Sequence, residues 1–342
     1  MKYLLEIHHG IGDVAQFTGL LDSISAYDKD AEIGVILNKR AYGAFFERDE
    51  RVRHTYVIDL RGTKRDLLKN VLAIRAGHYD YMFCSPISNA RDETVFVLLC
   101  GAKRAYGEQL RLLSRFSQRY GWRPAEFPHI VQRNFAVLAS SGLPVSPCYP
   151  RLICPDSTPA EISPRSVGLC VGASKPQKTW AIEHYIEVGR HFETLGYQIV
   201  LLGGAAEAER YAPDFFPASW TNLLGKTSLL ETASVCRKCA LVIGCDTGVM
   251  HIAAAVNVKT VCVFSYTNPQ MHAPFSDKSY VYCLSMPCQY CYDNRTAANC
   301  TDYACIKNVE AKDIISLSEA ALRGSEDAEP FRFKASLDAS PR

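Results

Sequence analysis

The stretch Ile243-Gly244-Cys245-Asp246-Thr247-Gly248-Val249-Met250-His251 decides the fold of the second half of this chain. It follows the apolar run 240–243, which predicts a buried strand, and precedes an Ala-rich segment, 252–255, which predicts a helix. The Gly-x-Asp-Thr-Gly turn therefore places unpaired backbone N–H groups at a helix start, where an anionic group can be held. With Asp246 and His251 on either side, this turn predicts a binding site for a nucleotide diphosphate.

The composition is that of an ordinary globular protein long enough for two domains. The chain has 342 residues, of which 48% are hydrophobic and 22% charged, so sizeable cores can form. A net charge of +2 gives no general reason to expect nucleic acid as a partner. No apolar run reaches the length of a membrane span, and residues 1–9 turn polar too early for a signal peptide. We therefore expect a cytoplasmic protein.

Fourteen cysteines are many for that compartment, and they fall into two groups. Nine lie mostly in apolar runs and are expected to be small buried hydrophobic residues. The other five crowd into the C-terminal region, namely Cys283, Cys288, Cys291, Cys300 and Cys305. The spacing Cys288-x2-Cys291-x8-Cys300-x4-Cys305 predicts a structural tetrathiolate site for zinc or iron, with reduced structural thiols as the alternative.

The first half of the chain alternates predicted strands and helices. The strands are expected at 3–7, 32–37, 56–59 and 79–84, and the helices at 14–27, 94–100 and 133–141. Such a β-α-β series predicts a parallel sheet with helices on both faces. Six prolines between 144 and 164 then indicate an interdomain linker, because proline continues neither helices nor central strands.

The alternation begins again after the linker. Strands are expected at 166–171, 198–202, 241–243 and 260–264, and helices at 182–195 and 228–237, the second of which starts with a capping box, Ser228-x-x-Glu231. We therefore predict an α/β protein of two Rossmann-like domains, 1–155 and 156–323, whose parallel sheets face a central cleft. The Cys-rich segment 283–305 belongs to the second domain, and 324–342 is expected to be a loosely held tail.

The turn after the first strand, Gly10-Ile11-Gly12-Asp13, matches a dinucleotide fingerprint only weakly, since no acid follows the second strand for a ribose hydroxyl. A carboxylate at this place suits another task. Asp13 can take a proton from an acceptor hydroxyl as that oxygen attacks a sugar carbon. The alternative is that Asp13 caps the first helix, and the local sequence leaves both open.

Two further strand-to-helix turns carry charged side chains. The first contains Lys175 and Lys178, which can meet a leaving diphosphate as point charges; the alternative is a solvated loop. The second begins with paired glycines, which permit close approach of the backbone, and Glu207 or Glu209 can then accept from ribose hydroxyls. The alternative there is an ordinary turn with acids in the first helical turn.

Three arginines are spaced four residues apart, at Arg111, Arg115 and Arg119. On a helix their guanidinium groups would share one face. Such a face can meet the phosphates or carboxylates of an acidic acceptor, or it can be a solvated basic surface.

Taken in order, these motifs resemble glycosyltransferase family 9, the lipopolysaccharide heptosyltransferases, over residues 2–322. The shared pieces are the early Gly-x-Gly-Asp turn, Gly-Ala-Ser with a downstream Lys-x-Trp, the Leu-Leu-Gly-Gly strand end, Leu-Leu-Gly-Lys-Thr-Ser-Leu and Gly-x-Asp-Thr-Gly-x-Met-His-x-Ala-Ala. The last of these is the most specific. The resemblance implies a GT-B fold, in which the N-terminal domain binds the acceptor and the C-terminal domain binds the nucleotide sugar.

The resemblance also implies a role for each site residue. In the N-terminal domain Asp13 would be the general base. Separately from the resemblance, we expect the acceptor to lie against Gly12 and the face formed by the three arginines. In the C-terminal domain the donor-binding residues would be Lys178 for the phosphates, Glu207 or Glu209 for the ribose, Thr227 near the base, Asp246 for the sugar, and Thr247, Gly248 and His251 in the turn. Thr179 stands where many relatives have a basic residue, so Lys175 stays open as an alternative to Lys178.

We therefore expect an inverting, metal-independent glycosyltransferase that moves a heptose, or a related sugar, from an ADP-sugar to an acceptor hydroxyl. The expected acceptor is the inner core of lipopolysaccharide, which implies a cytoplasmic protein working at the inner membrane surface. Three alternatives stay open. The acceptor can be a protein, since some relatives that modify bacterial surface proteins resemble this chain in holding a metal with cysteines. The chain can also be a sugar-nucleotide epimerase, or a non-enzymatic module that binds nucleotide sugars.

Overall fold

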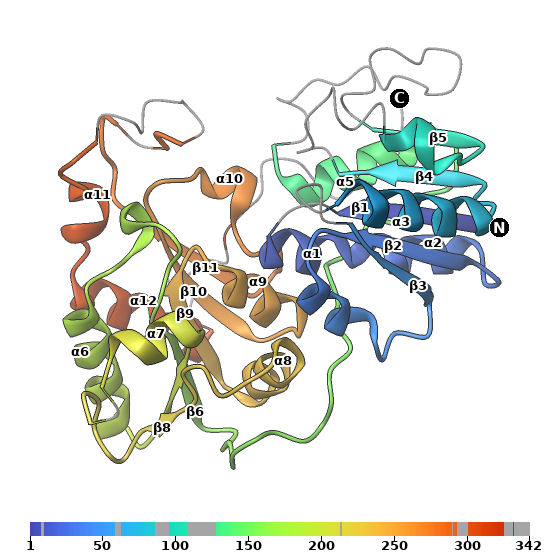
Figure 1. The fold of residues 1–342 in the computed structure, drawn as a ribbon. Helices are drawn as coiled ribbons and strands as arrows, with labels where there is room; N and C mark the ends of the chain where they lie inside the picture. Colours follow the sequence, from blue (N-terminus) through green and yellow to red (C-terminus); the bar gives the residue numbers. More distant parts are fainter. Residues whose placement is uncertain are drawn as a thin grey trace. The chain divides into compact units, whose positions relative to one another are not determined.

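The computed structural model describes residues 1–7, 10–58, 63–85, 96–107, 128–212, 214–288, 290–292, 300–324 and 331. Within these residues the chain forms two compact units, one up to Ile153 and one from Cys154 onward, each built on one sheet (Figure 1). Every strand pairing in both sheets is parallel, which confirms the predicted α/β class. The predicted tail at 324–342 lies outside the described residues except for Gly324 and Phe331.

The first unit contains a five-stranded sheet in the order β3-β2-β1-β4-β5. Its strands are β1 (Lys2–Ile7), β2 (Glu32–Leu37), β3 (Val52–Val57), β4 (Tyr81–Cys84) and β5 (Arg104–Tyr106). Its helices are α1 (Ile11–Phe17), α2 (Gly19–Tyr27), the 3-10 helix η1 (Arg40–Phe46), α3 (Lys64–Ala76), a helical segment at 96–100 and α5 (Ile130–Ala139). The central strand β1 is almost wholly buried, as expected for a parallel strand with both faces covered.

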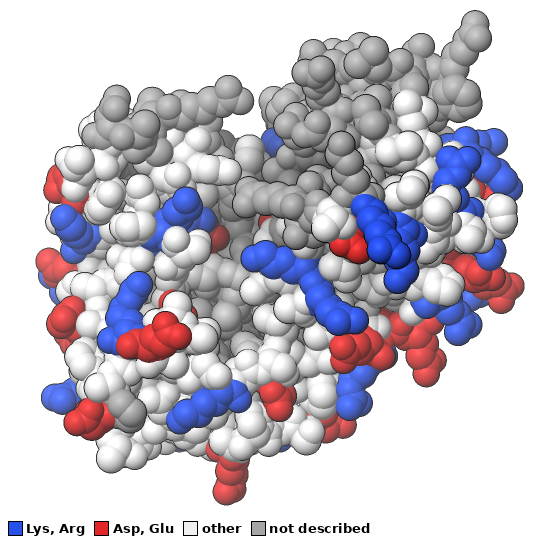
Figure 2. All heavy atoms as spheres, in the orientation of Figure 1, with Lys and Arg blue, Asp and Glu red and all other residues white. Residues whose placement is uncertain are grey.

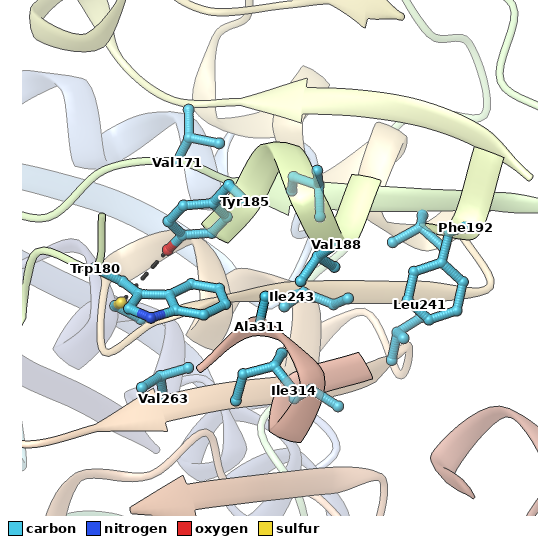
Figure 3. Close-up of a cluster of buried hydrophobic side chains, with 14 of the residues drawn as sticks. Val171, Trp180, Tyr185, Val188, Phe192, Leu241, Ile243, Val263, Ala311 and Ile314 are labelled. Carbon is cyan, nitrogen blue, oxygen red and sulfur yellow. Dashed lines mark hydrogen bonds between the residues drawn. The ribbon is translucent and has the colours of Figure 1, made fainter. Parts of the chain in front are cut away.

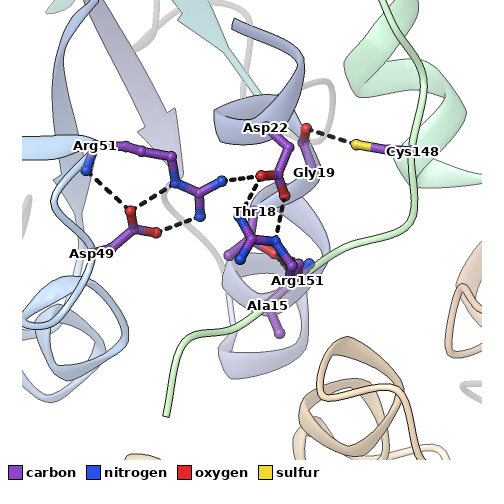
Figure 4. A network of polar contacts seen from close by, with 8 residues as sticks. All are labelled: Ala15, Thr18, Gly19, Asp22, Asp49, Arg51, Cys148 and Arg151. Atoms are coloured by element: carbon purple, nitrogen blue, oxygen red, sulfur yellow. Dashed lines mark hydrogen bonds and ion pairs between the residues drawn. The ribbon is translucent and has the colours of Figure 1, made fainter. Parts of the chain in front are cut away.

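The prediction of one continuous helix at 14–27 is wrong, because the chain breaks at Thr18 into α1 and α2. The Thr18 hydroxyl accepts the backbone N–H of Arg151 at 3.0 Å (Figure 4). A Cβ on the next residue, Gly19, would lie only 3.2 Å from the carbonyl oxygen of Cys148. The helix is therefore interrupted at the point where the segment 148–151 packs against it. The local spacing of apolar residues in 14–27 carries no sign of this long-range contact.

An ion-pair network holds the same segment in place (Figure 4). Asp22 of α2 pairs with Arg51 and with Arg151, the second at 2.6 Å. Arg51 also pairs with the buried Asp49. The chain is thus anchored to α2 two residues before the first unit ends at Ile153.

The second unit contains a six-stranded sheet in the order β11-β10-β9-β6-β7-β8. Its strands are β6 (Ser166–Cys170), β7 (Gln198–Leu202), β8 (Thr221–Asn222), β9 (Leu241–Cys245), β10 (Lys259–Phe264) and β11 (Ser279–Cys283). Its helices are η2 (Pro176–Lys178), α6 (Ile182–Thr194), α7 (Ala205–Arg210), α8 (Leu229–Lys238), α9 (Gly248–Ala255), α10 (Pro269–His272), α11 (Ala304–Lys307) and α12 (Ala311–Arg323). The predicted capping box of α8 is confirmed, since Ser228 and Glu231 each accept the other's backbone N–H.

The hydrophobic core of this unit fixes the strand ends that carry the site (Figure 3). Trp180, two residues after Lys178, is 3% exposed and donates its indole N–H to the carbonyl oxygen of Val309 at 2.8 Å. Beside it, the hydroxyl of Tyr185 lies 3.4 Å from the sulfur of Cys245, the last residue of β9. The loop after β6 and the end of β9 are therefore both held by buried aromatic side chains.

All fourteen cysteines are free thiols. Those buried within the two cores are Cys84, Cys100, Cys170, Cys236, Cys239, Cys245 and Cys262, which confirms the prediction for seven of the nine. Burial raises the pKa of Cys170 to about 12, so its thiol stays protonated near neutral pH.

No helix among the described residues combines the length and the apolar character needed to cross a bilayer. The longest of these described helices, α3, α6 and α12, have 13 residues each.

Candidate functional site

The site residues predicted in the second unit lie at the carboxyl edge of its sheet. Going across the sheet from β10 through β9, β6 and β7 to β8, the residues that follow the strands are Thr267, Asp246, Lys178, Glu207 and Thr227. Neighbouring strands lie about 4.8 Å apart, so these positions form a row along one edge. Ligands of open parallel sheets bind beyond this edge.

A buried ion pair lies in the middle of the row. Lys178 of η2 donates to Oδ2 of Asp246, directly after β9, and the side chains are 18% and 7% exposed. The hydroxyl of Thr267 donates to the same oxygen at 2.5 Å. Three loops, after β6, β9 and β10, are therefore tied together on one carboxylate oxygen.

The other oxygen of this carboxylate faces His251, one helical turn into α9. Nε2 of His251 lies 3.7 Å from Oδ1 of Asp246. Burial by itself raises the pKa of Asp246, but the nearby imidazole of His251 and the charge of Lys178 outweigh it, and the pKa lies well below its usual range. Asp246 is therefore ionised at neutral pH although it is buried.

The turn that follows Asp246 has the predicted form. Thr247 is the N-cap of α9 in an extended conformation, and Gly248 is the first helical residue. The first N–H groups of a helix have no partner inside the helix, so they are available to an anion. The Thr247 hydroxyl is 3.4 Å from the sulfur of Cys170 at the end of β6, which fixes the turn against the neighbouring strand.

Of the two candidate lysines, Lys178 is the one in the row. Lys175 is exposed, whereas Lys178 is half-buried and lies 5.9 Å from the centre of the Tyr266 ring. The loop is held from the β10 side as well, because the Ser265 hydroxyl donates to the carbonyl oxygen of Gln177 at 2.7 Å. An ammonium group has three N–H donors, so Lys178 keeps donors for a ligand while it is paired with Asp246.

Glu207 and Glu209 differ in their surroundings. Glu207 is the third residue of α7, where Oε2 accepts the backbone N–H of Gly204 at 2.8 Å. Its side chain also lies over Gly172, because a Cβ on that glycine would be 2.3 Å from Oε1 of Glu207. Glu209 is exposed on α7. Glu207 is therefore the glutamate that lies against the β6 loop.

Thr227 belongs to the loop after β8. Its hydroxyl lies 2.8 Å from the hydroxyl of Thr232 in α8. Thr227 is the last position of the row, four strands away from Thr267.

In the first unit, Gly12 and Asp13 lie in the first turn of α1, at the carboxyl end of β1. Oδ2 of Asp13 accepts the backbone N–H of Gly10 at 2.9 Å, and the side chain is half-buried. The Asp13 carboxylate therefore caps the start of α1. Arg111, Arg115 and Arg119 lie outside the described residues.

The four cysteines of the expected metal site lie within electrostatic range of one another. Burial raises the pKa of Cys305, and the nearby thiols of Cys288, Cys291 and Cys300 raise it further. Still, within the described part of the chain no three His, Cys, Asp or Glu side chains are arranged as a ready metal site. In the described residues these four thiols are therefore not arranged as the ligands of a metal ion.

The sequence interpretation missed Thr267 and Tyr266. Both follow the apolar run that forms β10, so the rule that ligand-binding residues follow parallel strands points to them. Only the strand order, in which β10 is next to β9, brings Thr267 to Asp246.

Replacing Thr267 with valine is expected to lower the free energy of unfolding by about 1.5–3 kcal/mol, because it removes a hydrogen bond to a buried charge. The matched control is Thr260→Val, which removes a bond between neutral groups, the Thr260 and Ser279 hydroxyls, and should cost about 0.5–1.5 kcal/mol. Urea unfolding at pH 7 measures both. Equal losses would show that Thr267 does not stabilise the Asp246 charge.

Comparison with known proteins points to one family. The family model described as glycosyltransferase family 9 (heptosyltransferase) matches residues 73–301. Lipooligosaccharide heptosyltransferase 2 of Haemophilus influenzae is 36% identical over 120 residues, and the match covers 33% of this chain and 35% of that protein. The chain thus spans about a third of the length of this curated relative.

Two solved structures share the fold over nearly the whole chain. A family 9 glycosyltransferase from Veillonella parvula superposes with a TM-score of 0.80 at 19% identity, covering 95% of this chain and 98% of its own. The ADP-heptose lipopolysaccharide heptosyltransferase II of Escherichia coli gives a TM-score of 0.75 at 21% identity, covering 95% and 99%. These likenesses confirm the predicted GT-B fold.

Proposed function

Because this chain belongs to glycosyltransferase family 9, as its motifs predicted, we propose that it transfers a heptose, or a related sugar, from an ADP-sugar to a hydroxyl of the lipopolysaccharide inner core. The observation that carries the proposal is the row at the carboxyl edge of the second sheet, with Lys178 and Asp246 at its centre. The names of the heptosyltransferases of Haemophilus influenzae and Escherichia coli support heptose as the sugar.

The order of the row suits an extended nucleotide sugar. The sugar would lie by Asp246, and the diphosphate would accept hydrogen bonds from Lys178 and from the amides of Thr247 and Gly248. His251, which faces the other oxygen of Asp246, would keep this carboxylate in place.

The nucleoside would lie on the other side of the diphosphate from the sugar, along the same edge of the sheet, next to the loops that follow β7 and β8. Glu207 would accept from the ribose hydroxyls, with the exposed Glu209 as the less favoured candidate, and Thr227 would lie near the base. A ligand in this pose runs across four strands in the order in which the sheet presents them.

We propose a single displacement with inversion. The acceptor hydroxyl attacks the anomeric carbon, its proton passes to Asp13, and the bond to the nucleoside diphosphate breaks with the electron pair going to the phosphate oxygen. Lys178 and the helix N-terminus stabilise the charge that grows on that oxygen. These groups supply a positive field without a catalytic metal ion. The arginines Arg111, Arg115 and Arg119, together with Gly12, would meet the anionic acceptor.

Replacing Gly172 with alanine tests the role of Glu207 without replacing Glu207 itself. The new methyl group would displace the flexible end of the Glu207 side chain, so donor affinity should fall about 10- to 100-fold while the melting temperature changes little. Titration calorimetry with the ADP-sugar measures the affinity. Gly43→Ala, whose Cβ would meet only ordinary contacts, is the control. Unchanged donor affinity in Gly172→Ala would remove Glu207 from the donor site.

We also propose that Cys288, Cys291, Cys300 and Cys305 hold a structural zinc or iron ion, because their thiols already lie within electrostatic range of one another. The purified chain is then expected to contain about one metal ion, and Cys291→Ser should lose it. Cys154→Ser, outside the group, is the control. Elemental analysis decides, and a metal-free native chain contradicts the proposal.

Incubation of the purified chain with ADP-heptose tests the proposed function. Release of ADP that depends on a lipopolysaccharide core acceptor is the expected result. Acceptor-dependent release with a protein acceptor alone would favour the protein-modifying alternative. An epimerised donor, or binding without turnover, would overturn the proposal in favour of an epimerase or a binding module.

A further inference from the structure

Four leucines of the first unit point into solvent from two helical segments. Leu68 and Leu72 of α3 are each 58% exposed, and Leu98 and Leu99 of the segment 96–100 are 49% and 44% exposed. Single exposed leucines are common on soluble proteins. Four exposed leucines on one surface are uncommon, and exposed apolar patches of this kind mark interaction sites.

The two segments form one layer. Their inward side chains, Val71 and Ile74 of α3 and Phe96 and Val97 of the other segment, belong to the same hydrophobic cluster. Their ends are joined as well, because Nη1 of Arg75 donates to the carbonyl oxygen of Leu99 at 3.1 Å. The outward leucines therefore belong to one surface, which we call the leucine patch.

Basic side chains surround the patch on α3. Arg65 and Lys69 precede and follow Leu68, and Arg75 lies three residues after Leu72, all of them exposed. Helix α3 has one acid, Asp66, against four basic residues, so its net charge is positive. In Figure 2, blue Lys and Arg side chains gather beside white ones on the face where α3 lies.

We propose that the leucine patch docks on an anionic lipid bilayer. Apolar side chains with basic neighbours fit such a surface, since the leucines enter the boundary between headgroups and acyl chains while the basic heads stay with the lipid phosphates. The positive rim also selects a negatively charged partner. The inference rests on the proposed function, because an acceptor embedded in a membrane requires the enzyme to come to that surface.

Vesicle binding by the full chain tests the proposal. We expect co-sedimentation with vesicles of equimolar phosphatidylglycerol and phosphatidylcholine, little with phosphatidylcholine alone, and weaker binding at high salt. The pair Arg65→Gln and Lys69→Gln should lower the partition coefficient about 25-fold, at about fivefold per charge. The pair Leu68→Gln and Leu72→Gln should lower it at least about tenfold.

Leu195→Gln is the matched control, because Leu195 is 42% exposed but lies in the second unit after α6. Circular dichroism checks that each variant is folded. Failure of the native chain to bind anionic vesicles, or equal binding by the patch variants, overturns the proposal. A native dimer that the leucine pair converts to monomers also overturns it, since a second copy then covers the patch.

A water-soluble, deacylated acceptor separates this inference from the proposed function. The patch variants should transfer sugar to that acceptor at the native rate, because the patch binds the membrane and not the sugar. If the native chain binds vesicles but transfers nothing, the proposed function fails and the docking surface stands. If it transfers sugar but ignores vesicles, only the docking surface fails.

Discussion

Asparagine in place of Asp13 is expected to lower kcat by about 10²–10⁴-fold, the usual contribution of a positioned general base. The amide keeps an oxygen that can accept the Gly10 N–H, so the start of α1 should stay intact. Donor affinity should also survive, since the residues proposed to bind the donor belong to the second unit. Steady-state ADP release and calorimetry with the ADP-sugar measure the two quantities.

The control uses a second acid in the same helical position. Asp66 is the third residue of α3, and its carboxylate accepts a hydrogen bond from the hydroxyl of the N-cap residue Thr63. Asp13 is likewise the third residue of α1, and its carboxylate accepts the backbone N–H of the N-cap residue Gly10. Asp66→Asn should therefore change the local cap without changing turnover on a soluble acceptor. If Asp13→Asn behaves like Asp66→Asn, the carboxylate at position 13 is a helix cap and nothing more.

Methionine in place of Lys178 is expected to destabilise the second unit by about 3–5 kcal/mol, the cost of leaving one charge of a buried pair without its partner. Asp246 is only 7% exposed, so water cannot replace the lost ammonium group. The double variant Lys178→Met with Asp246→Asn should recover much of the loss, because no buried charge remains. Urea unfolding at pH 7 measures all three chains.

A surface pair provides the comparison for this effect. Lys103 pairs with Asp80 at 2.7 Å, but its side chain is 72% exposed. Lys103→Met should therefore cost no more than about 1 kcal/mol. Similar losses in the two lysine variants would mean that the Asp246 charge is solvated in the folded chain, contrary to its surroundings in the structure.

The ion pair of Lys178 and Asp246 also predicts how the stability of the protein changes at acid pH. The pKa of Asp246 is lower in the folded chain than in the unfolded chain, so its contribution to stability is complete above the unfolded value of about 4. As the pH falls below that value toward the folded pKa, the contribution is lost. Loss of Lys178 removes one cause of the low pKa, so the variant should become acid-sensitive at a higher pH than the native chain.

The sequence was sufficient to predict those features that depend only on residues close together in the chain. Ser228 and Glu231 are three residues apart, and their capping box is present as predicted. The strand, turn and helix around Asp246 also follow from an apolar run, a glycine and an Ala-rich segment. The motif order likewise predicted the family correctly.

Local sequence failed where distant segments meet. The break at Thr18 depends on the Arg151 backbone, which is far away in sequence. The amphipathic helices α3 and α12 and the strand β11 were not predicted. Their apolar residues complete cores whose other parts come from distant elements. For α12, however, the buried residues Ile314, Ser318 and Ala321 follow a clear helical spacing, so this helix could have been predicted from the sequence.

By itself, the sequence determined the α/β class, the family and the turn that presents amides to an anion, because each depends on residues close together in the chain. The tertiary structure alone decided that Lys178 rather than Lys175 reaches Asp246, that Thr267 donates to the same carboxylate, and that Glu207 lies over Gly172. These contacts join loops after different strands. The order of strands across a sheet arises from packing of the whole chain, and that order places the loops side by side.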